Sequence, residues 1–272
     1  MRIRRALWWS APLLLVTGVI VRHRLHRAVD DRTWSPDQAR VVSYAARGDT
    51  VTIANVRDAD PRTRAPRWGT RTFDLAGLDS VWLVVAPFSE GWRGLAHICV
   101  TFGFRNSDHV GISVEARREP GVDYSVLAGT FDRYQVLYVV GTERDLIGRR
   151  VWDAEGPVYL YPIRATPAAI RTLFTAMLDR AAALGERPEF YNTLTNNCTS
   201  NLIAHVQPLV GRRIPAAWLS VMPGYADAVA DRLGLIADSA DIATERLRYR
   251  IPPAARAALD SADFSSQIRK SR

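Results

Sequence analysis

Hydrophobic and polar residues follow three patterns along the chain, and each pattern predicts a different kind of element. The first is the uncharged run Ala6–Val21, which has arginines on both sides. Its 16 residues rise about 24 Å as a helix, slightly less than the ~30 Å hydrocarbon core of a bilayer. No small-residue cleavage motif follows, so the run predicts an uncleaved single-pass anchor within residues 1–27, with a cleaved signal peptide as the alternative.

The second pattern consists of apolar stretches of strand length in the middle of the chain. Val81–Val85 is a short continuous apolar run, which is typical of a buried strand. Residues 95–104 and 109–116 lie on either side of a polar loop centred on Asn106, and this arrangement predicts a β-hairpin. Two more strands are predicted at 133–142 and 156–163. Residues 28–70 are polar and rich in turn residues, and they predict only extended chain.

The third pattern is helical spacing, which dominates the C-terminal part. Thr166 is a good N-cap, Pro167 suits the first turn, and Gly185 is expected to end this helix in the left-handed conformation. The apolar residues between them recur on one helix face: Ile170, Leu173, Phe174, Met177, Leu178, Ala181 and Leu184. A second helix is predicted from Cys198 to Gly211.

Shorter helices are predicted at 223–233 and 252–261, and the polar tail from Ser261 is expected to be frayed. Strands thus precede helices along the chain. This order argues for an α+β domain in which an antiparallel sheet packs on helices. Roughly 230 residues remain beyond the N-terminal segment, enough for one sizeable core.

The composition excludes some classes of function but does not indicate one. Hydrophobic residues make up 47% of the 272 residues, as in a globular protein. The formal charge is +8, but the basic residues are almost all arginines, scattered among acids without a dense run in the globular part. We therefore expect no nucleic-acid partner. Two cysteines and five histidines, without CxxC or HExxH spacing, predict no metal site and no cofactor.

The segment FYNTLTNNCTSNL contains the most informative chemistry. Asn196 and Asn197 precede the predicted helix and offer capping side chains, which places Cys198 in the first turn. Free backbone N–H groups and the helix dipole favour a negative charge there, so a cysteine in this position commonly has a lowered pKa. The same N–H groups would stabilise the oxyanion of an acyl-transfer intermediate. A buried structural cysteine is the alternative interpretation.

A thiol nucleophile needs a base, usually a histidine oriented by a third polar group. His205 follows Cys198 by seven residues, about 10 Å further along the helix axis, which is too far for a hydrogen bond. In a hairpin centred on Asn106, paired positions have numbers that add up to 212, so His97 lies opposite Glu115. Cys198, His97 and Glu115 are therefore the candidate nucleophile, base and acid.

Two other residues keep alternatives open. Cys99 lies two residues beyond His97 on the same strand face, so it is a second candidate nucleophile, a disulfide partner of Cys198, or a core residue. It lacks the helix N-terminus and therefore ranks below Cys198. His109 lies at the hairpin loop, where we expect it to be solvated.

Four motifs follow one another along the chain: LAHICVTFGF, GISVEARREPGVDYS, YVVGTERDLIGRRV and PEFYNTLTNNCTSNL. Together they resemble the Lnb N-terminal periplasmic domain family over roughly residues 56–224. The resemblance implies a permuted papain-like, NlpC-type fold, in which the histidine strand precedes the cysteine helix. The family's enzymes are lipoprotein N-acyltransferases that resemble a soluble domain followed by several membrane spans, whereas no sufficiently long apolar run follows residue 224 here.

The apolar pattern and the resemblance together divide the chain. Residues 1–27 are the membrane anchor or uncleaved signal, 28–250 the Lnb-like periplasmic domain, and 251–272 a short helix and frayed tail. The expected location is the bacterial inner membrane, with a single span and the globular part in the periplasm.

The function implied by the resemblance is thiol-dependent acyl transfer or hydrolysis on phospholipid or lipoprotein acyl groups. Cys198 would take an acyl chain from a phospholipid as a thioester and pass it to an amine or to water. The expected substrate-binding residues surround it: Tyr191, Asn196, Asn197 and Thr199. The alternatives are a papain-like amidase or peptidase on cell-wall peptide and a non-catalytic periplasmic binding module.

Overall fold

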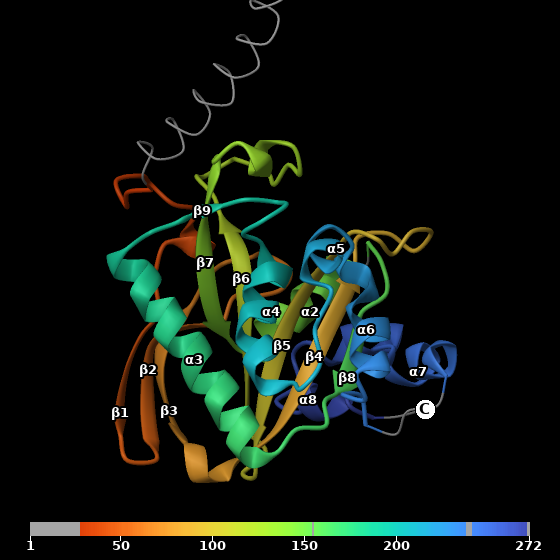
Figure 1. Ribbon diagram of the computed structural model, residues 1–272. Coiled ribbons are helices and arrows are strands. Elements are labelled where there is room, and N and C mark those ends of the chain that lie inside the picture. The colour runs from red at the N-terminus through yellow and green to blue at the C-terminus, as the bar shows by residue number, and fades with distance from the viewer. Residues whose placement is uncertain (1–27, 154, 238–240, 271–272) are drawn as a thin grey trace, which may run out of the picture.

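Nine strands form one sheet in the described part of the computed structural model, which comprises residues 28–153, 155–237 and 241–270 (Figure 1). The strands are β1 (Ser43–Arg47), β2 (Thr50–Arg57), β3 (Trp68–Asp74), β4 (Leu78–Pro87), β5 (Ala96–Phe104), β6 (His109–Arg117), β7 (Tyr134–Gly141), β8 (Tyr159–Pro162) and β9 (Phe190–Tyr191). Their order is β1-β2-β7-β6-β5-β4-β8, with β3 beside β2 and β9 beside β7.

The sheet is mixed, so the prediction of an antiparallel sheet is wrong in one respect. β2 meets β7 in parallel at the pair Arg57–Gly141, whereas the other strand pairs are antiparallel. The α+β class itself is confirmed, since helices pack on both faces of this sheet. Among the described residues, no helix is both long and apolar enough to cross a bilayer. The predicted anchor lies in residues 1–27, outside the described residues.

Strands β1 and β2 and the start of β3 lie in residues 28–70, the segment that predicted only extended chain. Val51 and Ile53 of β2 are buried and Thr50 is exposed, which is the alternation of a half-buried strand. Asn55 then adopts a left-handed conformation (φ 61°), and the β2–β3 register shifts between Ile53 and Val56. This bulge breaks the alternation after four residues, and the strand pattern in the sequence is therefore too short to recognise.

Seven α-helices lie in the described part of the chain: α2 (Glu143–Asp153), α3 (Pro167–Glu186), α4 (Cys198–Val206), α5 (Ala216–Val221), α6 (Ala226–Arg232), α7 (Ile242–Tyr249) and α8 (Phe264–Gln267). Helix α3 begins as predicted, because Thr166 accepts a hydrogen bond from the backbone N–H of Ala169 and Pro167 starts the first turn. It continues through Gly185 to Glu186, so the predicted left-handed end is wrong.

The C-terminal part differs from the prediction in several further places: α5 and α7 were not predicted, and the helix predicted at 252–261 is a 3-10 helix, Pro253–Ala258. Helix α4 ends at Val206 and passes into a short 3-10 turn, Gln207–Leu209, rather than running to Gly211. The tail is folded rather than frayed, because Phe264 and Ile268 are buried in an apolar cluster with Ile147 of α2. Helix α2 was not predicted, since its buried face includes acidic residues that hide the apolar pattern.

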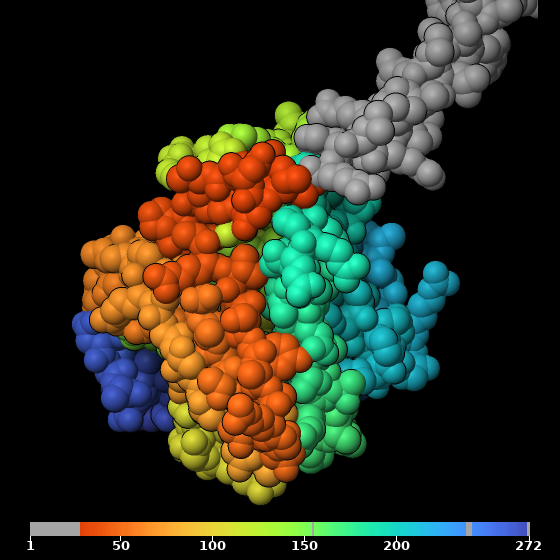
Figure 2. Space-filling model, turned by 90° about the vertical axis from the view of Figure 1, so that its left-hand side faces the viewer, coloured from red at the N-terminus to blue at the C-terminus, as the bar shows by residue number. Residues whose placement is uncertain are grey.

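The sheet separates two buried regions. Figure 1 shows α3 and α4 in front of the sheet and α2 and α8 behind it. On β5, Ile98 and Val100 point to the cluster on the α3–α4 side, whereas Cys99 belongs to the cluster on the α2 side. Figure 2 shows the N-terminal strands packed along α3, where the hydroxyl of Tyr44 donates to the carboxylate of Asp179.

Candidate active site

Cys198 is the first residue of α4, and a capping box holds it there. The side-chain oxygen of Asn197 accepts hydrogen bonds from the backbone N–H groups of Thr199 and Ser200, each at 2.9 Å. In return, the Ser200 hydroxyl accepts from the backbone N–H of Asn197 at 2.8 Å. The predicted first-turn position of Cys198 is therefore confirmed.

The sulfur of Cys198 is buried against β5. It lies beside the backbone N–H of Ile98 and 3.7 Å from the hydroxyl oxygen of Thr199. Burial raises the pKa of the Cys198 thiol, and these polar neighbours and the charge of Arg150 oppose the rise only in part. The lowered pKa expected from the sequence is therefore wrong, because this helix N-terminus is enclosed rather than open to water.

The β5–β6 hairpin has the predicted register. Cys99 pairs with Ser113 and Gly103 pairs with His109, and each pair of numbers adds up to 212. The ladder ends at Cys99–Ser113. His97, two residues beyond this end, forms a hydrogen bond between its Nε2 and the hydroxyl of Ser113 at 2.8 Å.

The imidazole of His97 is partly buried and neutral near neutral pH. Burial lowers its pKa to about 3; the charge of Arg150 contributes to this shift, and the negative charge of Glu115 opposes it. A neutral imidazole is in the protonation state that a general base requires.

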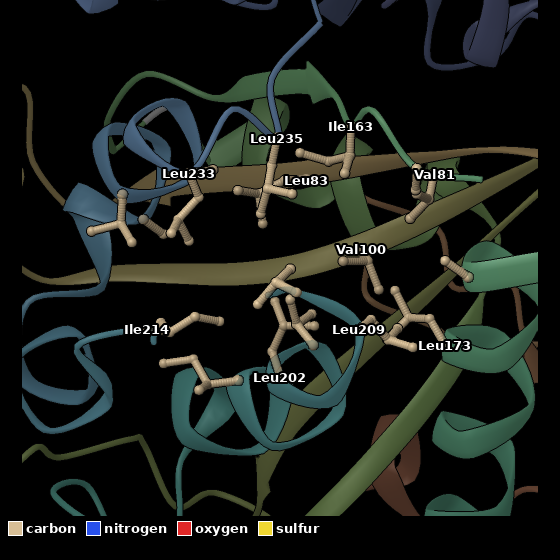
Figure 3. A pocket seen from close by; sticks show the side chains of 18 of the residues that line it. Val81, Leu83, Val100, Ile163, Leu173, Leu202, Leu209, Ile214, Leu233 and Leu235 are labelled. Atoms are coloured by element: carbon tan, nitrogen blue, oxygen red, sulfur yellow. The ribbon is translucent and has the colours of Figure 1, made fainter. Parts of the chain in front are cut away.

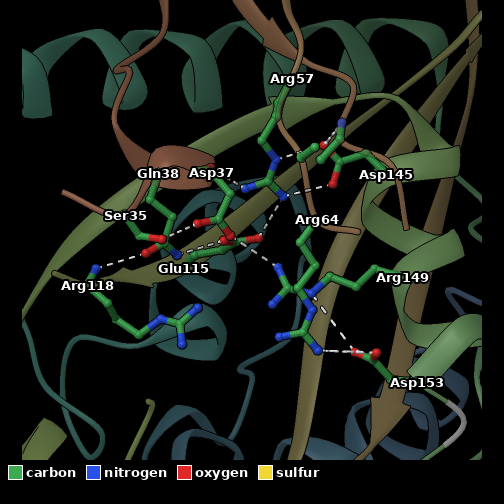
Figure 4. Close-up of polar contacts among 12 residues, drawn as sticks. Ser35, Asp37, Gln38, Arg57, Arg64, Glu115, Arg118, Asp145, Arg149 and Asp153 are labelled. Atoms are coloured by element: carbon green, nitrogen blue, oxygen red, sulfur yellow. Dashed lines mark hydrogen bonds and ion pairs between the residues drawn. The ribbon is translucent and has the colours of Figure 1, made fainter. Parts of the chain in front are cut away.

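The carboxylate of Glu115 contacts Gln38 and Arg57 rather than the His97 ring (Figure 4). One carboxylate oxygen accepts a hydrogen bond from Nε2 of Gln38 at 3.0 Å, and the other lies 3.5 Å from Nη2 of Arg57. Burial raises the pKa of this carboxyl, but the charges of Arg57 and Arg149 outweigh the burial and hold the pKa well below its usual range. Glu115 is therefore an ionised neighbour of His97, whereas the hydrogen-bond partner of His97 is Ser113.

Arg57 links Glu115 to a buried ion pair. Its side chain is 1% exposed, and its Nε and Nη2 donate to the two oxygens of Asp145 at 2.7 and 3.0 Å. Its Nη1 donates to the backbone carbonyl of Asp37 at 2.8 Å. This network fixes the position of the Glu115 carboxylate from three separate segments of the chain (Figure 4).

Cys198 and His97 lie on opposite faces of the sheet. Cys198 belongs to the apolar cluster on the α3–α4 side. His97 shares a strand face with Cys99, which packs on the α2 side. The Ile98 N–H, just beyond the last β5–β6 pair, lies beside the Cys198 sulfur. The two candidate residues therefore flank the point where pairing between β5 and β6 ends.

Among the predicted substrate-binding residues, the two asparagines have structural hydrogen bonds. The Asn196 side chain donates to the carbonyl of Phe190 at 2.9 Å and accepts from Asn201 at 2.8 Å. The Asn197 side chain, besides capping α4, donates to the carbonyls of Thr193 and Ser220. These amides are used within the protein, so they position the loop around Cys198.

Tyr191 and Thr199 lie at the sulfur itself. The hydroxyl of Tyr191 lies near the backbone N–H of Cys198, and burial raises the pKa of this phenol. Tyr191 therefore stays protonated. The Thr199 side chain is almost completely buried and faces a cavity beside Cys198. A helix N–H, a phenolic hydroxyl and a thiol thus meet at the first turn of α4.

The alternative residues lie apart from this arrangement. Cys99 and Cys198 are both free thiols, and burial raises the pKa of Cys99 to about 12. His205, in the last turn of α4, forms a hydrogen bond from Nε2 to the hydroxyl of Tyr138 at 2.9 Å. The Nδ1 atom of His109 lies 3.0 Å from the carbonyl oxygen of Ser107 in the hairpin loop.

An apolar cavity of about 470 Å³ lies between the sheet and helices α3, α4 and α6 (Figure 3). Aliphatic side chains from both the strands and the helices point into it, including Leu83, Val100 and Leu202. Ile98 and Thr199, which lie beside the Cys198 sulfur, are part of its wall. The cavity therefore extends from the immediate surroundings of the candidate nucleophile.

Sequence reasoning missed three polar residues of the site. In the predicted register Ser113 is the diagonal neighbour of His97. The register alone could therefore have identified Ser113 as a hydrogen-bond partner of His97. Gln38 and Arg57 gave no such signal, because they contact Glu115 across 77 and 58 positions of sequence.

Comparison with protein families now adds an independent finding. The model of the Lnb N-terminal periplasmic domain matches residues 64–223, more than half of the chain. The chain belongs to the Lnb N-terminal periplasmic domain family. Comparisons with curated proteins and with solved structures give no match.

Membership in the Lnb N-terminal periplasmic domain family makes this a periplasmic domain, and the resemblance seen in the sequence motifs is confirmed. The matched region contains His97, Glu115 and Cys198. Strands β1 and β2 precede it, so Gln38 and Arg57, which hold the Glu115 carboxylate, lie outside the family match.

Proposed function

We propose that this chain is a membrane-anchored periplasmic enzyme that transfers or hydrolyses acyl groups of phospholipids or lipoproteins through Cys198. The observation that carries the proposal is the apolar cavity, whose wall includes Ile98 and Thr199 on either side of the Cys198 sulfur. An acyl chain in this cavity would have its ester carbonyl beside the thiol. The proposed anchor is the uncharged run Ala6–Val21 of the sequence.

The character of the cavity favours an acyl chain over a wall peptide. Its lining is aliphatic, and Arg164 is the charged residue in it. A peptide would bury amide groups there without hydrogen-bond partners, which costs roughly 1–3 kcal/mol for each group. An acyl chain instead gains about 0.8 kcal/mol for each CH₂ group removed from water.

In the proposed reaction, the Cys198 thiol attacks the ester carbonyl, and its proton passes to the neutral imidazole of His97 across the point where the pairing between β5 and β6 ends. A C–S bond forms, and the carbonyl oxygen becomes an oxyanion that the backbone N–H of Cys198 and the hydroxyl of Tyr191 stabilise. The C–O bond then breaks, and the departing alkoxide takes the proton from the imidazolium. The resulting thioester is attacked by an amine or by water, which regenerates the thiol.

Ser113 and Glu115 support His97 in this scheme. The Ser113 hydroxyl orients the ring through its hydrogen bond to Nε2. The ionised Glu115 carboxylate raises the pKa of His97 against the effect of burial, so it favours the imidazolium formed during the reaction. The order of the His97 strand and the Cys198 helix fits the permuted NlpC-type arrangement that we propose for this domain.

A second candidate function is a non-catalytic, lipid-binding periplasmic module. One observation favours it: burial raises the pKa of Cys198 and lowers that of His97, so the resting pair is a neutral thiol and a neutral imidazole. Such a pair reacts only if the proton moves during the attack. The cavity would serve both functions, whereas only the enzyme needs the thiol. A papain-like amidase or peptidase on cell-wall peptide remains a third proposal.

Substitution of the thiol separates these functions. Cys198→Ala should abolish release of acyl groups from phospholipid, and Cys198→Ser should be nearly as inactive, because a serine hydroxyl is a weaker nucleophile without a base matched to it. Cys99→Ala is the matched control, since Cys99 is also a buried free thiol on β5. Full activity of a folded Cys198→Ala variant would exclude the proposed enzyme, and loss of activity in Cys99→Ala alone would transfer the role to Cys99.

A further inference from the structure

Six large apolar side chains are exposed around the N-terminal end of α4. Each is between 42% and 71% exposed, and we refer to them as the apolar rim: Trp92, Val126, Leu127, Phe131, Leu194 and Trp218. Water-exposed side chains of this size are individually unremarkable, but a group of them at one end of a domain marks an interaction surface.

Backbone contacts join the segments that carry the apolar rim. The hydroxyl of Thr193, next to Leu194, donates to the carbonyl of Val126 at 2.9 Å. The backbone N–H of Thr193 donates to the carbonyl of Gly129 at 3.0 Å. On the other side of α4, the Asn197 side chain donates to the carbonyl of Ser220 at 2.8 Å, in the helix of Trp218. The rim therefore surrounds the loop that positions Cys198.

The segment of Trp92 is held in the same way. The backbone N–H of Gly224 donates to the carbonyl of Gly94 at 3.1 Å. A Cβ atom at Gly94 would lie 2.3 Å from the Trp92 ring, so only glycine allows the ring to pack over this backbone. The Trp92 segment is thus tied to the turn that follows Trp218.

The described chain begins at the same end of the molecule. The side chain of Gln135, at the start of β7, donates to the carbonyl of Val29 at 2.8 Å. Arg32 donates to the carbonyl of Arg133, two residues after Phe131. Figure 2 shows the first described residues beside the segment that carries Val126, Leu127 and Phe131. In the sequence, 27 residues precede Ala28, and the uncharged run Ala6–Val21 is among them.

We propose that the apolar rim is a membrane-docking surface whose occupant is the phospholipid bilayer. Tryptophan prefers the interfacial region of a bilayer, and phenylalanine and leucine are typical of the apolar side that an interfacial segment buries in lipid. An uncharged run directly before this end of the domain would hold the rim at a bilayer surface. Docking in this orientation faces the loop around Cys198 to lipid. The proposal does not require that Cys198 is a nucleophile.

The test uses the full chain in nanodiscs of phosphatidylethanolamine and phosphatidylglycerol, loaded with one chain per disc. An environment-sensitive fluorophore is attached to Leu127→Cys and, in a second rim variant, to Phe131→Cys. Leu247→Cys is the matched control, because Leu247 is 76% exposed on α7 and Leu127 is 71% exposed. The native thiols are buried, and unsubstituted protein measures their background labelling.

Both rim labels should show blue-shifted emission and should lose intensity when brominated lipid replaces ordinary lipid, whereas the label at position 247 should do neither. Three results would overturn the proposal. One is a rim label that is not quenched by brominated lipid. Another is equal quenching at all three positions, which would show no preferred orientation. The third is an emission change that appears only with two chains per disc, which would identify the rim as an interface between copies.

Discussion

The two faces of the sheet differ in how their buried space is used. The face under α3 and α4 is apolar and keeps a cavity of about 470 Å³ beside Cys198. The face under α2 and α8 contains charges instead: the ion pair Arg57–Asp145, and Glu143, which pairs with Arg269. Both faces are buried, and the apolar face has room for a ligand.

This difference indicates that the two faces have different roles. Buried charges are held by specific partners at fixed distances, so the polar face fixes His97 and Glu115 in place. Aliphatic walls impose little directionality and accept a flexible chain. In the proposed enzyme, the polar face positions the base and the apolar face binds the acyl group, and the reaction takes place where the pairing between β5 and β6 ends.

The largest effect on activity is expected from the base on the polar face. His97→Ala should lower the turnover of phospholipid by roughly 10²–10⁴-fold, the usual loss for a general base. His205→Ala is the control, because His205 contacts Tyr138 in the last turn of α4. If His205→Ala is the more damaging of two equally folded variants, His97 is not the base.

The next largest effect is expected on stability, from removing the buried cation of the polar face. Arg57→Leu leaves Asp145 and Glu115 buried without their cation and should cost about 3–5 kcal/mol of unfolding free energy in denaturant titrations. Arg171→Leu, which removes an exposed ion pair with Asp49, should leave stability near that of the unsubstituted protein. Equal stability of the two variants would show that the buried network does not hold this face together.

The apolar face should respond in substrate preference rather than in stability. Leu233→Trp narrows the cavity, so turnover of long-chain phospholipid should fall at least about tenfold relative to a short-chain analogue. Leu247→Trp, on the exposed side of α7, should leave the turnover of both the long-chain and the short-chain substrate unchanged. Parallel loss for both chain lengths in Leu233→Trp would mean that the cavity does not bind the acyl chain.

The smallest effect is the pH dependence of stability that His97 contributes. Its pKa is about 3 in the folded protein and 6.5 in the unfolded chain, so only the unfolded state gains a proton between these values. This contribution is therefore constant above pH 6.5 and is lost as the pH falls towards 3, with a slope of at most about 1.4 kcal/mol per pH unit for one proton. His97→Gln should show a shallower dependence of unfolding free energy on pH in this range. Identical slopes for the two proteins would contradict the lowered pKa of His97.

What the sequence predicted correctly is local. The hairpin register follows from one polar loop between two apolar stretches, and the starts of α3 and α4 follow from Thr166 and Asn197. The bulge at Asn55 hid β2, and the buried acids of α2 hid a helix, because both break the apolar periodicity. The cavity also escaped prediction, since it depends on how three helices pack on the sheet rather than on any one segment.

The central claim is that Cys198 forms a thioester with an acyl chain. Intact-protein mass spectrometry after incubation with phospholipid, followed by peptide mapping, tests this most directly. The account predicts an added mass of one acyl chain on the peptide that contains Cys198, removed by hydroxylamine and absent from Cys198→Ala. An unmodified Cys198 in protein that releases acyl groups, or an acyl chain on Cys99 instead, would contradict it.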